Sequence, residues 1–171
     1  MTMISETRPY RLGVGIILVN RTGQVFVGQR VDTDQPSWQM PQGGVEEGED
    51  PRAAALRELQ EEVGTNKAEI VTETADWTVY DLPTELSRTV WNGRYRGQKQ
   101  KWYVMRFTGR DSDIDITGAK SPEFSAWQWM DLEKTLLHIV KFKYHVYARI
   151  ITEFRDAVTA ITKDSFHCYG D

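Results

Sequence analysis

The sequence of 171 residues has the length of one ordinary domain, and its 40% hydrophobic and 27% charged residues are typical of a globular protein. The net charge of −4 excludes a protein coated in basic surface, and the single cysteine, Cys168, excludes an internal disulfide and a multi-cysteine metal site. No apolar run approaches the ~18 residues of a membrane span, and residues 1–6 carry no secretion signal. We therefore expect a cytoplasmic protein with no membrane partner.

Charge is distributed unevenly along the chain. Residues 46–62 contain seven acids against Arg52 and Arg57, whereas residues 86–110 contain seven basic residues and no acid. Blocks of opposite sign suit a site that holds both a metal cation and a polyanion. They equally suit two solvated surfaces, and charge alone leaves both interpretations open.

The first half of the chain predicts a hairpin followed by a helix. Apolar runs at 12–19 and 24–29 flank turn residues at 20–23. After a short segment at 37–40 and the glycine-containing residues 41–44, Asp50 can cap a helix that has Pro51 at its first position. We expect that helix to end at Val63, with Gly64 as its left-handed stop.

The second half predicts further strands and a long helix. The strands are expected at 69–74, 77–82, 101–108 and 126–130. The helix is indicated by apolar residues spaced for one stripe: Val146, Ile150, Ile151, Phe154, Val158 and Ile161. This order predicts an α+β domain with α/β/α layers over residues 9–161, between an N-terminal extension (1–8) and a flexible tail (162–171).

The helix at 51–63 carries the most informative side chains. On a helical wheel one side is apolar and is expected to be buried: Ala55, Leu56, Leu59 and Val63. Glu58, Glu61 and Glu62 share the other side, where they repel one another, and Arg57 alone cannot neutralise them. A divalent cation such as Mg²⁺ would compensate their charge. The alternative is a solvent-exposed acidic face.

The spacing around this helix resembles the signature of the Nudix hydrolases, which cleave nucleoside diphosphates linked to another group. It reads Gly43-x5-Glu49-x7-Arg57-Glu58-Leu59-x-Glu61-Glu62-x-Gly64-Thr65. Every fixed polar and glycine position matches, and the one departure is Thr65, at a packing position that is usually aliphatic. The resemblance implies a Nudix fold: an α/β/α sandwich with a mixed sheet, in which this segment forms a loop–helix–loop.

The resemblance also implies roles for these residues. Glu58, Glu61 and Glu62 would hold one to three Mg²⁺ ions, with Mn²⁺ as a substitute, and the carbonyl of Gly43 would add a ligand. Arg57 would orient a glutamate, and Glu49 would position the preceding loop. A metal-bound water would attack phosphorus, so no protein nucleophile is needed and Cys168 would be a bystander. Which glutamate acts as general base stays open.

Segments outside the signature resemble one branch, the bacterial RNA pyrophosphohydrolases and plant-type dinucleoside polyphosphate hydrolases. The similarity spans residues 9–155. Its pieces are Tyr10–Arg11 and Gly13–Leu18, Ser37–Gly44, Gly97–Trp102, Pro122–Phe124, and Phe142–Lys143 with Tyr147. Gln42 belongs to them, because many other branches have two glycines directly after the proline.

Outside the signature, the residues expected at the substrate fall into three kinds. Glu123 matches an additional carboxylate near the metals, either a ligand or the general base. Tyr80 and Phe142 would stack on the base or pack in the core. The remaining substrate contacts are Arg30, Gln42, Lys99, Lys101 and Lys143; Lys99 and Lys101 share one strand face and could instead form a solvated edge.

We carry three functional hypotheses from the sequence. The leading one is Mg²⁺-dependent hydrolysis of dinucleoside polyphosphates, such as diadenosine tetraphosphate to ATP and AMP. The second is removal of pyrophosphate from 5′-triphosphorylated RNA, and the third is a catalytically inactive nucleotide-binding module. The partners expected are these substrates and no DNA, with the chain a monomer or weak homodimer.

Overall fold

The computed structural model describes residues 6–31 and 37–167, with side chains described to residue 162. Its strands are β1 (Tyr10–Val19), β2 (Val25–Arg30), β3 (Trp38–Gln39), β4 (Gln42–Gly44), β5 (Ala68–Glu73), β6 (Thr78–Asp81), β7 (Gly97–Phe107) and β8 (Phe124–Met130). Its α-helices are α1 (Pro51–Val63), α2 (Thr84–Ser87) and α3 (Tyr144–His167). Short 3₁₀ turns cover Val90–Gly93, Asp111–Asp113, Leu132–Leu137 and Lys141–Lys143.

The strands form a mixed sheet, as the sequence predicts. β1 and β7 run parallel along their whole paired length, from Tyr10 opposite Gly97 to Val19 opposite Arg106. β5 and β6 pair antiparallel with β7, and β8 pairs antiparallel with β2. β1 pairs with β2 at Val19 and with β4 at residues 13–15, so its partner changes along its length.

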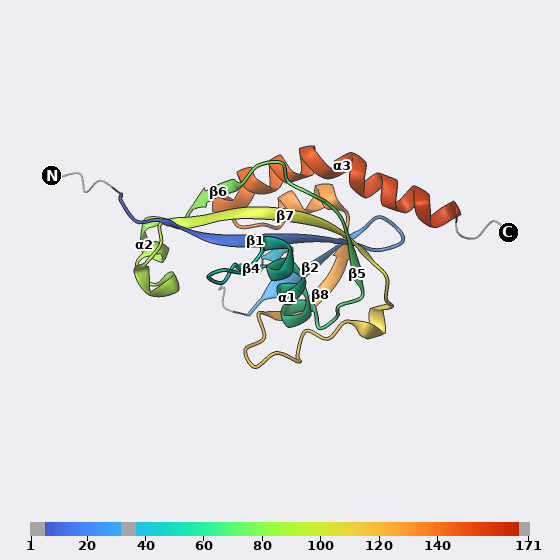
Figure 1. The fold of residues 1–171 in the computed structure, drawn as a ribbon, viewed down its shortest axis with the longest axis horizontal. Coiled ribbons are helices and arrows are strands. Elements are labelled where there is room, and N and C mark those ends of the chain that lie inside the picture. The colour runs from blue at the N-terminus through green and yellow to red at the C-terminus, as the bar shows by residue number, and fades with distance from the viewer. Residues whose placement is uncertain (1–5, 32–36, 168–171) are drawn as a thin grey trace.

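Helices cover both faces of the sheet, and each face has its own hydrophobic core (Figure 1). Alternate residues of β1 enter different cores because successive side chains of a strand point to opposite faces. Ile17 packs in the core that α3 covers, and Ile16 packs in the core that contains Leu59 of α1. The predicted α/β/α layering is therefore confirmed.

Local sequence fixes both ends of α1. The Asp50 side chain accepts a hydrogen bond from the backbone N–H of Arg52 at 3.4 Å, and Pro51 opens the helix. Gly64 ends it with φ of 79°, the left-handed conformation expected of a glycine stop. The predicted limits of this helix are confirmed.

Two expectations about the helices differ from the structure. Leu56 is 41% exposed, because α1 turns Glu58 and Glu62, rather than Leu56, toward the sheet. α3 continues to His167, where the sequence predicts a flexible tail from residue 162; helical hydrogen bonding extends past Ile161, the last residue of the apolar stripe. Residues 1–5 and 168–171, which include Cys168, lie outside the described part of the chain.

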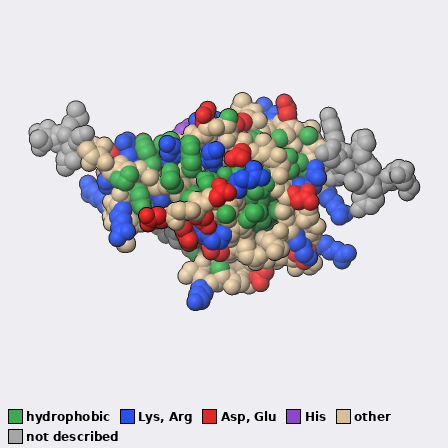
Figure 2. All heavy atoms as spheres, in the orientation of Figure 1, with side chains coloured by type: hydrophobic (Ala, Val, Ile, Leu, Met, Phe, Trp, Pro, Cys, Tyr) green, Lys and Arg blue, Asp and Glu red, His purple; other side chains and the backbone are tan. Residues whose placement is uncertain are grey.

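The helices of the described residues include none that is both long and apolar enough to cross a membrane. Acidic and basic side chains are interspersed on the face that Figure 2 shows. Three members of the basic block at 86–110 are paired with acids outside it: Arg96 with Asp81, Lys101 with Glu73 and Arg106 with Glu69. The block therefore does not form one continuous basic surface.

Candidate active site

A cavity of about 440 Å³ opens beside β4 and the α1 carboxylates. Its lining brings together four acids, three cations, three aromatic rings and several amides that are far apart in the sequence. They are Glu58, Glu61, Glu62 and Glu123; Arg11, Arg30 and Lys143; Tyr80, Trp91 and Phe142; and Gln39, Gln42 and Gln98. Such a lining offers oxygen ligands to a cation, positive charge to phosphate and flat surfaces to a base.

Two α1 carboxylates are buried against β4. Glu58 is 9% exposed and Glu62 is 8% exposed, whereas Glu61 points to solvent. A β-carbon on Gly43 would lie 1.9 Å from the carboxyl carbon of Glu58, so only glycine allows this approach. The backbone N–H of Gln42 donates to Glu62 Oε2 at 3.1 Å. The strand β4 thus fixes the positions of both carboxylates.

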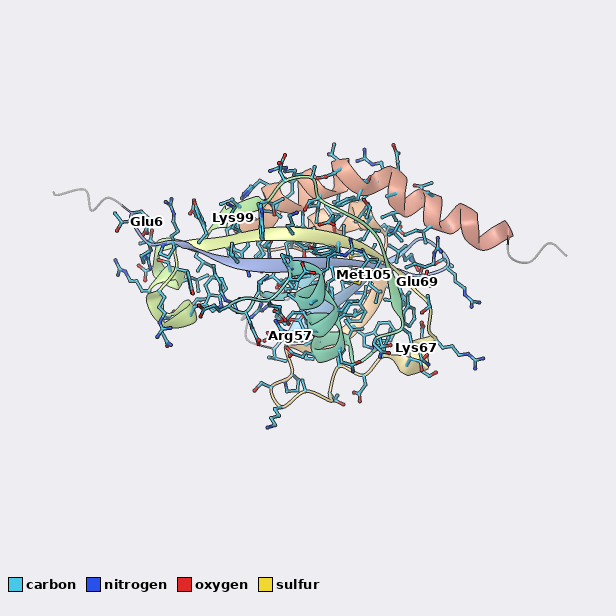
Figure 3. The ribbon with its side chains drawn as sticks, viewed as in Figure 1. Glu6, Arg57, Lys67, Glu69, Lys99 and Met105 are labelled. Carbon is cyan, nitrogen blue, oxygen red and sulfur yellow. The ribbon has the colours of Figure 1, made fainter. Side chains whose placement is uncertain are left out.

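Arg57 connects the helix to the preceding loop (Figure 3). Its Nη2 donates to the carbonyl of Gly44 at 2.8 Å and to Glu49 Oε1 at 2.9 Å. Its Nη1 donates to Glu58 Oε1 at 3.0 Å and lies 3.3 Å from Glu61 Oε1. Glu49, Glu58 and Glu61 thus share one guanidinium, whose single positive charge cannot balance three carboxylates.

The pKa values of the two buried carboxyl groups are raised, as expected where positive charge is scarce. Burial, together with the charge of Glu61, raises the pKa of Glu58 to about 7 despite the opposing effect of Arg57. Burial, and then the charges of Glu58 and Glu123, raise the pKa of Glu62 well above its ordinary value. A bound divalent cation would stabilise both ionised forms, so the electrostatics of this site favour such an ion.

Glu123 lies in the loop before β8 and lines the same cavity as the α1 carboxylates. Its Oε2 lies 3.7 Å from Nη2 of Arg30, at the point where a bulge shifts the register of β2. Glu123 lines the cavity and also a second one of about 690 Å³, beside Lys120 and Ser121. The fold therefore brings Glu123 to the signature helix, 61 residues away in sequence from Glu62.

Three cations line the same cavity as these carboxylates: Arg11, Arg30 and Lys143. The guanidinium of Arg11 lies over the ring of Trp91, with its carbon 5.0 Å from the ring centre. Lys143 is buried, and its Nζ donates to Gln39 Oε1 at 3.2 Å. Arg30 and Lys143 thus lie where the sequence expects substrate contacts. Arg11 and Trp91 are not among the site residues expected from the sequence. Tyr10–Arg11 is one of the segments that resemble the branch, and this signal could have identified Arg11.

The rings of Tyr80 and Phe142 lie together, with centres 5.8 Å apart. Tyr80 is 2% exposed and belongs to the core, and Phe142 packs against that core. Lys143 Nζ lies 5.6 Å from the Tyr80 ring centre and 5.8 Å from that of Phe142. Both residues therefore line the cavity while they also support the core.

Lys99 and Lys101 are not part of the cavity lining. Their ammonium groups lie 5.7 and 5.8 Å from the ring centre of Trp77, and Lys101 pairs with Glu73. Figure 3 shows Lys99 on β7, well separated from Arg57 on α1. The two lysines do share one strand face, as expected, but Gln98 on the other face reaches the cavity.

The donor chemistry of the site fits a hard cation. Among the described residues, no three acidic, histidine or cysteine side chains are gathered closely enough to enclose a metal ion. The glutamates are instead directed at protein partners: Glu58 at Arg57, Glu62 at the N–H of Gln42 and Glu123 at Arg30. Their carboxylate oxygens are nevertheless the type of ligand that a hard divalent cation prefers.

Comparison of the sequence with models of protein families identifies the family of this chain. The model of the NUDIX domain matches residues 9–150, most of the chain. The chain belongs to the Nudix family. The resemblance seen in the signature is thereby confirmed, and this Nudix hydrolase is an enzyme that acts on phosphoanhydride bonds.

Curated relatives of this Nudix hydrolase are similar over nearly their whole length. The RNA pyrophosphohydrolase of Roseobacter denitrificans is 57% identical over 148 residues, which are 85% of this chain and 92% of the relative. That of Wolbachia pipientis subsp. Culex pipiens is 48% identical over 163 residues, 95% of this chain and 100% of the relative. The RNA pyrophosphohydrolase of Rhodospirillum rubrum is 52% identical over 145 residues, 85% of this chain and 87% of the relative.

Solved structures share the fold of this Nudix domain at low identity. The E. coli dihydroneopterin triphosphate pyrophosphohydrolase has a TM-score of 0.64 at 20% identity, with 85% of this chain and 99% of that chain covered. A C. elegans Ap4A hydrolase complex has a TM-score of 0.62 at 19% identity, with 86% and 98% covered. At such identity these structures support the Nudix fold alone.

Proposed function

We propose that this Nudix hydrolase removes pyrophosphate from 5′-triphosphorylated RNA. The observation that carries the proposal is the sequence identity of 48–57% to three RNA pyrophosphohydrolases, over 85–95% of this chain. This favours the second of the hypotheses drawn from the sequence over the leading one. The Ap4A hydrolase, at 19% identity, supports the fold but not its substrate.

The site is suited to a nucleoside followed by several phosphates. The rings of Phe142 and Trp91 both line the cavity and offer stacking surfaces that tolerate different bases. Arg11, Arg30 and Lys143 provide positive charge for the phosphates, next to the carboxylates that would hold the metal. Gln42 lines the same cavity, in keeping with its expected place among the substrate contacts.

Mg²⁺, or Mn²⁺ in its place, is the cofactor of the proposed reaction. Glu58, Glu61, Glu62 and Glu123 would hold it, together with the carbonyl of Gly43. When bound, such an ion neutralises phosphate charge and lowers the pKa of a coordinated water. The raised pKa values of Glu58 and Glu62 support this assignment, because both groups gain from a neighbouring cation.

The chain's own residues position the reactants in this proposal. Arg57 and the N–H of Gln42 hold the carboxylates of Glu58 and Glu62. Arg11, Arg30 and Lys143 orient the phosphates and stabilise the charge of the leaving pyrophosphate. A glutamate of the set takes up the proton of the attacking water. The presence of Glu58, Glu61 and Glu62 together opposes the hypothesis of an inactive binding module, because such a module has no need of carboxylates that repel one another.

The surface suits a short contact with RNA. The net charge is −4, and acidic side chains are interspersed among the basic ones on the face in Figure 2, so a long polyanion finds no continuous basic track across it. An enzyme that binds only the first nucleotides of its substrate does not need such a track. Action in the cytoplasm on RNA rather than DNA, as a monomer or weak homodimer, completes the proposal.

The test compares two substrates with the same preparation in Mg²⁺. We expect release of pyrophosphate from a 5′-triphosphorylated oligoribonucleotide to exceed the turnover of diadenosine tetraphosphate. A Glu62→Gln preparation, purified in parallel, controls for contaminating hydrolases. Efficient cleavage of diadenosine tetraphosphate without conversion of the RNA would instead establish the leading hypothesis drawn from the sequence.

A further inference from the structure

Three buried polar side chains on one face of β7 form a continuous hydrogen-bonded row. Trp102 Nε1 donates to Gln100 Oε1 at 3.2 Å, and Gln100 Nε2 donates to Gln98 Oε1 at 3.0 Å. Each of the three side chains is at most 1% exposed. The row begins in the core beneath α3 and ends at Gln98, which lines the cavity.

The indole at the start of this row determines the direction of every bond in it. An indole N–H can only donate, so the oxygen of Gln100 must face Trp102. The amide nitrogen of Gln100 then faces away from the indole, where it donates to Gln98 Oε1 and also to Gln42 Oε1, the latter at 3.2 Å. The oxygen of Gln98 must then face Gln100. The hydroxyl of Tyr80 donates to the same oxygen at 2.9 Å, and burial raises the pKa of Tyr80 to about 12, which keeps this hydroxyl protonated.

In this arrangement the side-chain amide nitrogen of Gln98 points away from the hydrogen-bonded row. It is buried, and it has no hydrogen-bond partner among the described residues. A β-carbon on Gly13 would lie 2.1 Å from it, so glycine at this position makes the space for the amide. Gly13 pairs with Gly44, where a β-carbon would lie 2.1 Å from Nη2 of Arg11. Gln98 Nε2 and the Arg11 guanidinium thus lie over two paired glycines.

A donor beside a guanidinium suits an anionic oxygen. We propose that Trp102 and Gln100 are positioning residues, which hold Gln98 with its amide N–H directed at a phosphoryl oxygen of the substrate. Neither Trp102 nor Gln100 itself contacts the phosphate. The inference rests on the proposed function in that the phosphoryl oxygen belongs to a 5′-triphosphate.

Substitutions by uncharged residues distinguish the effect of the donor, Gln98, from that of the residues that orient it. Gln98→Met removes the donor, Gln100→Met removes its orientation, and Trp102→Phe removes the indole N–H. Gln128→Met, at an exposed position of β8, is the matched control. The probe is a nucleoside triphosphate with a methylene bridge between its α- and β-phosphates, and its dissociation constant is measured by calorimetry, with melting temperatures checked for every variant.

We expect Gln98→Met to weaken binding of the probe about tenfold, as loss of one hydrogen bond to a charged group does. Gln100→Met and Trp102→Phe should weaken it about threefold to tenfold, and Gln128→Met should not change it. With triphosphorylated RNA, the KM should rise in the same order while kcat changes little. Unaltered binding by Gln98→Met overturns the inference, and unaltered binding by the other two variants overturns the positioning roles.

A second measurement uses the wild-type protein and therefore does not depend on whether a variant folds. In the wild-type protein, the side-chain amide signals of Gln98 in a ¹H–¹⁵N spectrum should move downfield when the probe is added. Signals that do not move overturn the inference. These outcomes can be told apart from a failure of the proposed function. If the probe binds through Gln98 but triphosphorylated RNA is not converted, the inference stands and the proposed function is refuted.

Discussion

Arg57 and Glu49 form a two-point ion pair in which Nε and Nη2 each donate, at 2.9 Å, to a different carboxylate oxygen. The pair joins the middle of α1 to a loop eight residues earlier. Because a planar guanidinium matches a carboxylate at two points, the pair fixes orientation as well as distance. It thereby holds the loop and helix of the signature in one arrangement.

Loss of this pair should destabilise the protein in a pH-dependent way. Hydrogen bonds from Arg57 lower the pKa of Glu49 to about 2, and a lowered pKa contributes stability that is lost as the pH falls toward it. We expect Glu49→Gln to lower the melting temperature by several degrees at pH 7, and the difference from wild type to shrink at pH 3. Thermal unfolding at both values tests this, with exposed Glu47→Gln as control. A difference independent of pH would contradict it.

Glu58 should make the opposite contribution in metal-free protein. Its pKa of about 7 exceeds the value near 4.3 of an unfolded chain, so the folded state binds the extra proton between these values and loses stability as the pH rises through them. We expect the melting temperature in chelator to fall between pH 5 and pH 8, and to fall less in Glu58→Gln. Saturating Mg²⁺ should reduce this difference between the proteins. Equal slopes in chelator would refute the assignment.

Glu62 should be essential for activity but not for folding. We expect Glu62→Gln to lower turnover by at least roughly a hundredfold, because it removes one metal-holding charge. Its melting temperature without metal should equal or exceed that of wild type, since burial and the neighbouring carboxylates disfavour the ionised form of Glu62, a cost that a neutral amide does not carry. Glu85→Gln, at an exposed site on α2, controls for the change of charge. Near-normal activity of folded Glu62→Gln would exclude the proposed role.

The role of Glu123 can be decided by a Mg²⁺ titration at several pH values. We favour a metal-holding role, because Glu123 lines the same cavity as Glu62 and its charge raises the pKa of Glu62. Glu123→Gln should then need more Mg²⁺ for half-maximal activity and recover most of its rate at saturation. If extra Mg²⁺ restores nothing and the acidic limb of the pH–rate profile disappears, Glu123 is instead the general base.

We expect the basic side chains that line the cavity, rather than Lys99 and Lys101, to bind the substrate. We expect Arg11→Ala to raise the KM about tenfold or more and to weaken its dependence on salt, because a cation next to phosphate is lost. The double variant Lys99→Ala/Lys101→Ala should leave KM near that of wild type, since both lysines lie against Trp77. A larger effect from the double variant than from Arg11→Ala would restore the phosphate contacts expected from the sequence.

The sequence by itself determines α1, because the signals for that helix are local. Asp50, Pro51 and Gly64 act within one or two residues of the helix ends, and the signature spacing sets Arg57 and its glutamates in fixed relation. The same holds for strand alternation: Lys99 and Lys101 lie on one face of β7, as predicted. Family membership follows from the same local pattern.

Only the tertiary structure decides which faces meet. Alternation along β7 places the lysines and Gln98 on opposite faces, but only the fold shows that the face with Gln98 is the one that borders the cavity. Arg11 and Trp91 meet across 80 positions, and Glu62 becomes buried because Gly43 admits α1 against β4. Contacts between segments so distant leave no periodic trace in the sequence, since each depends on surfaces that exist only once the sheet has formed.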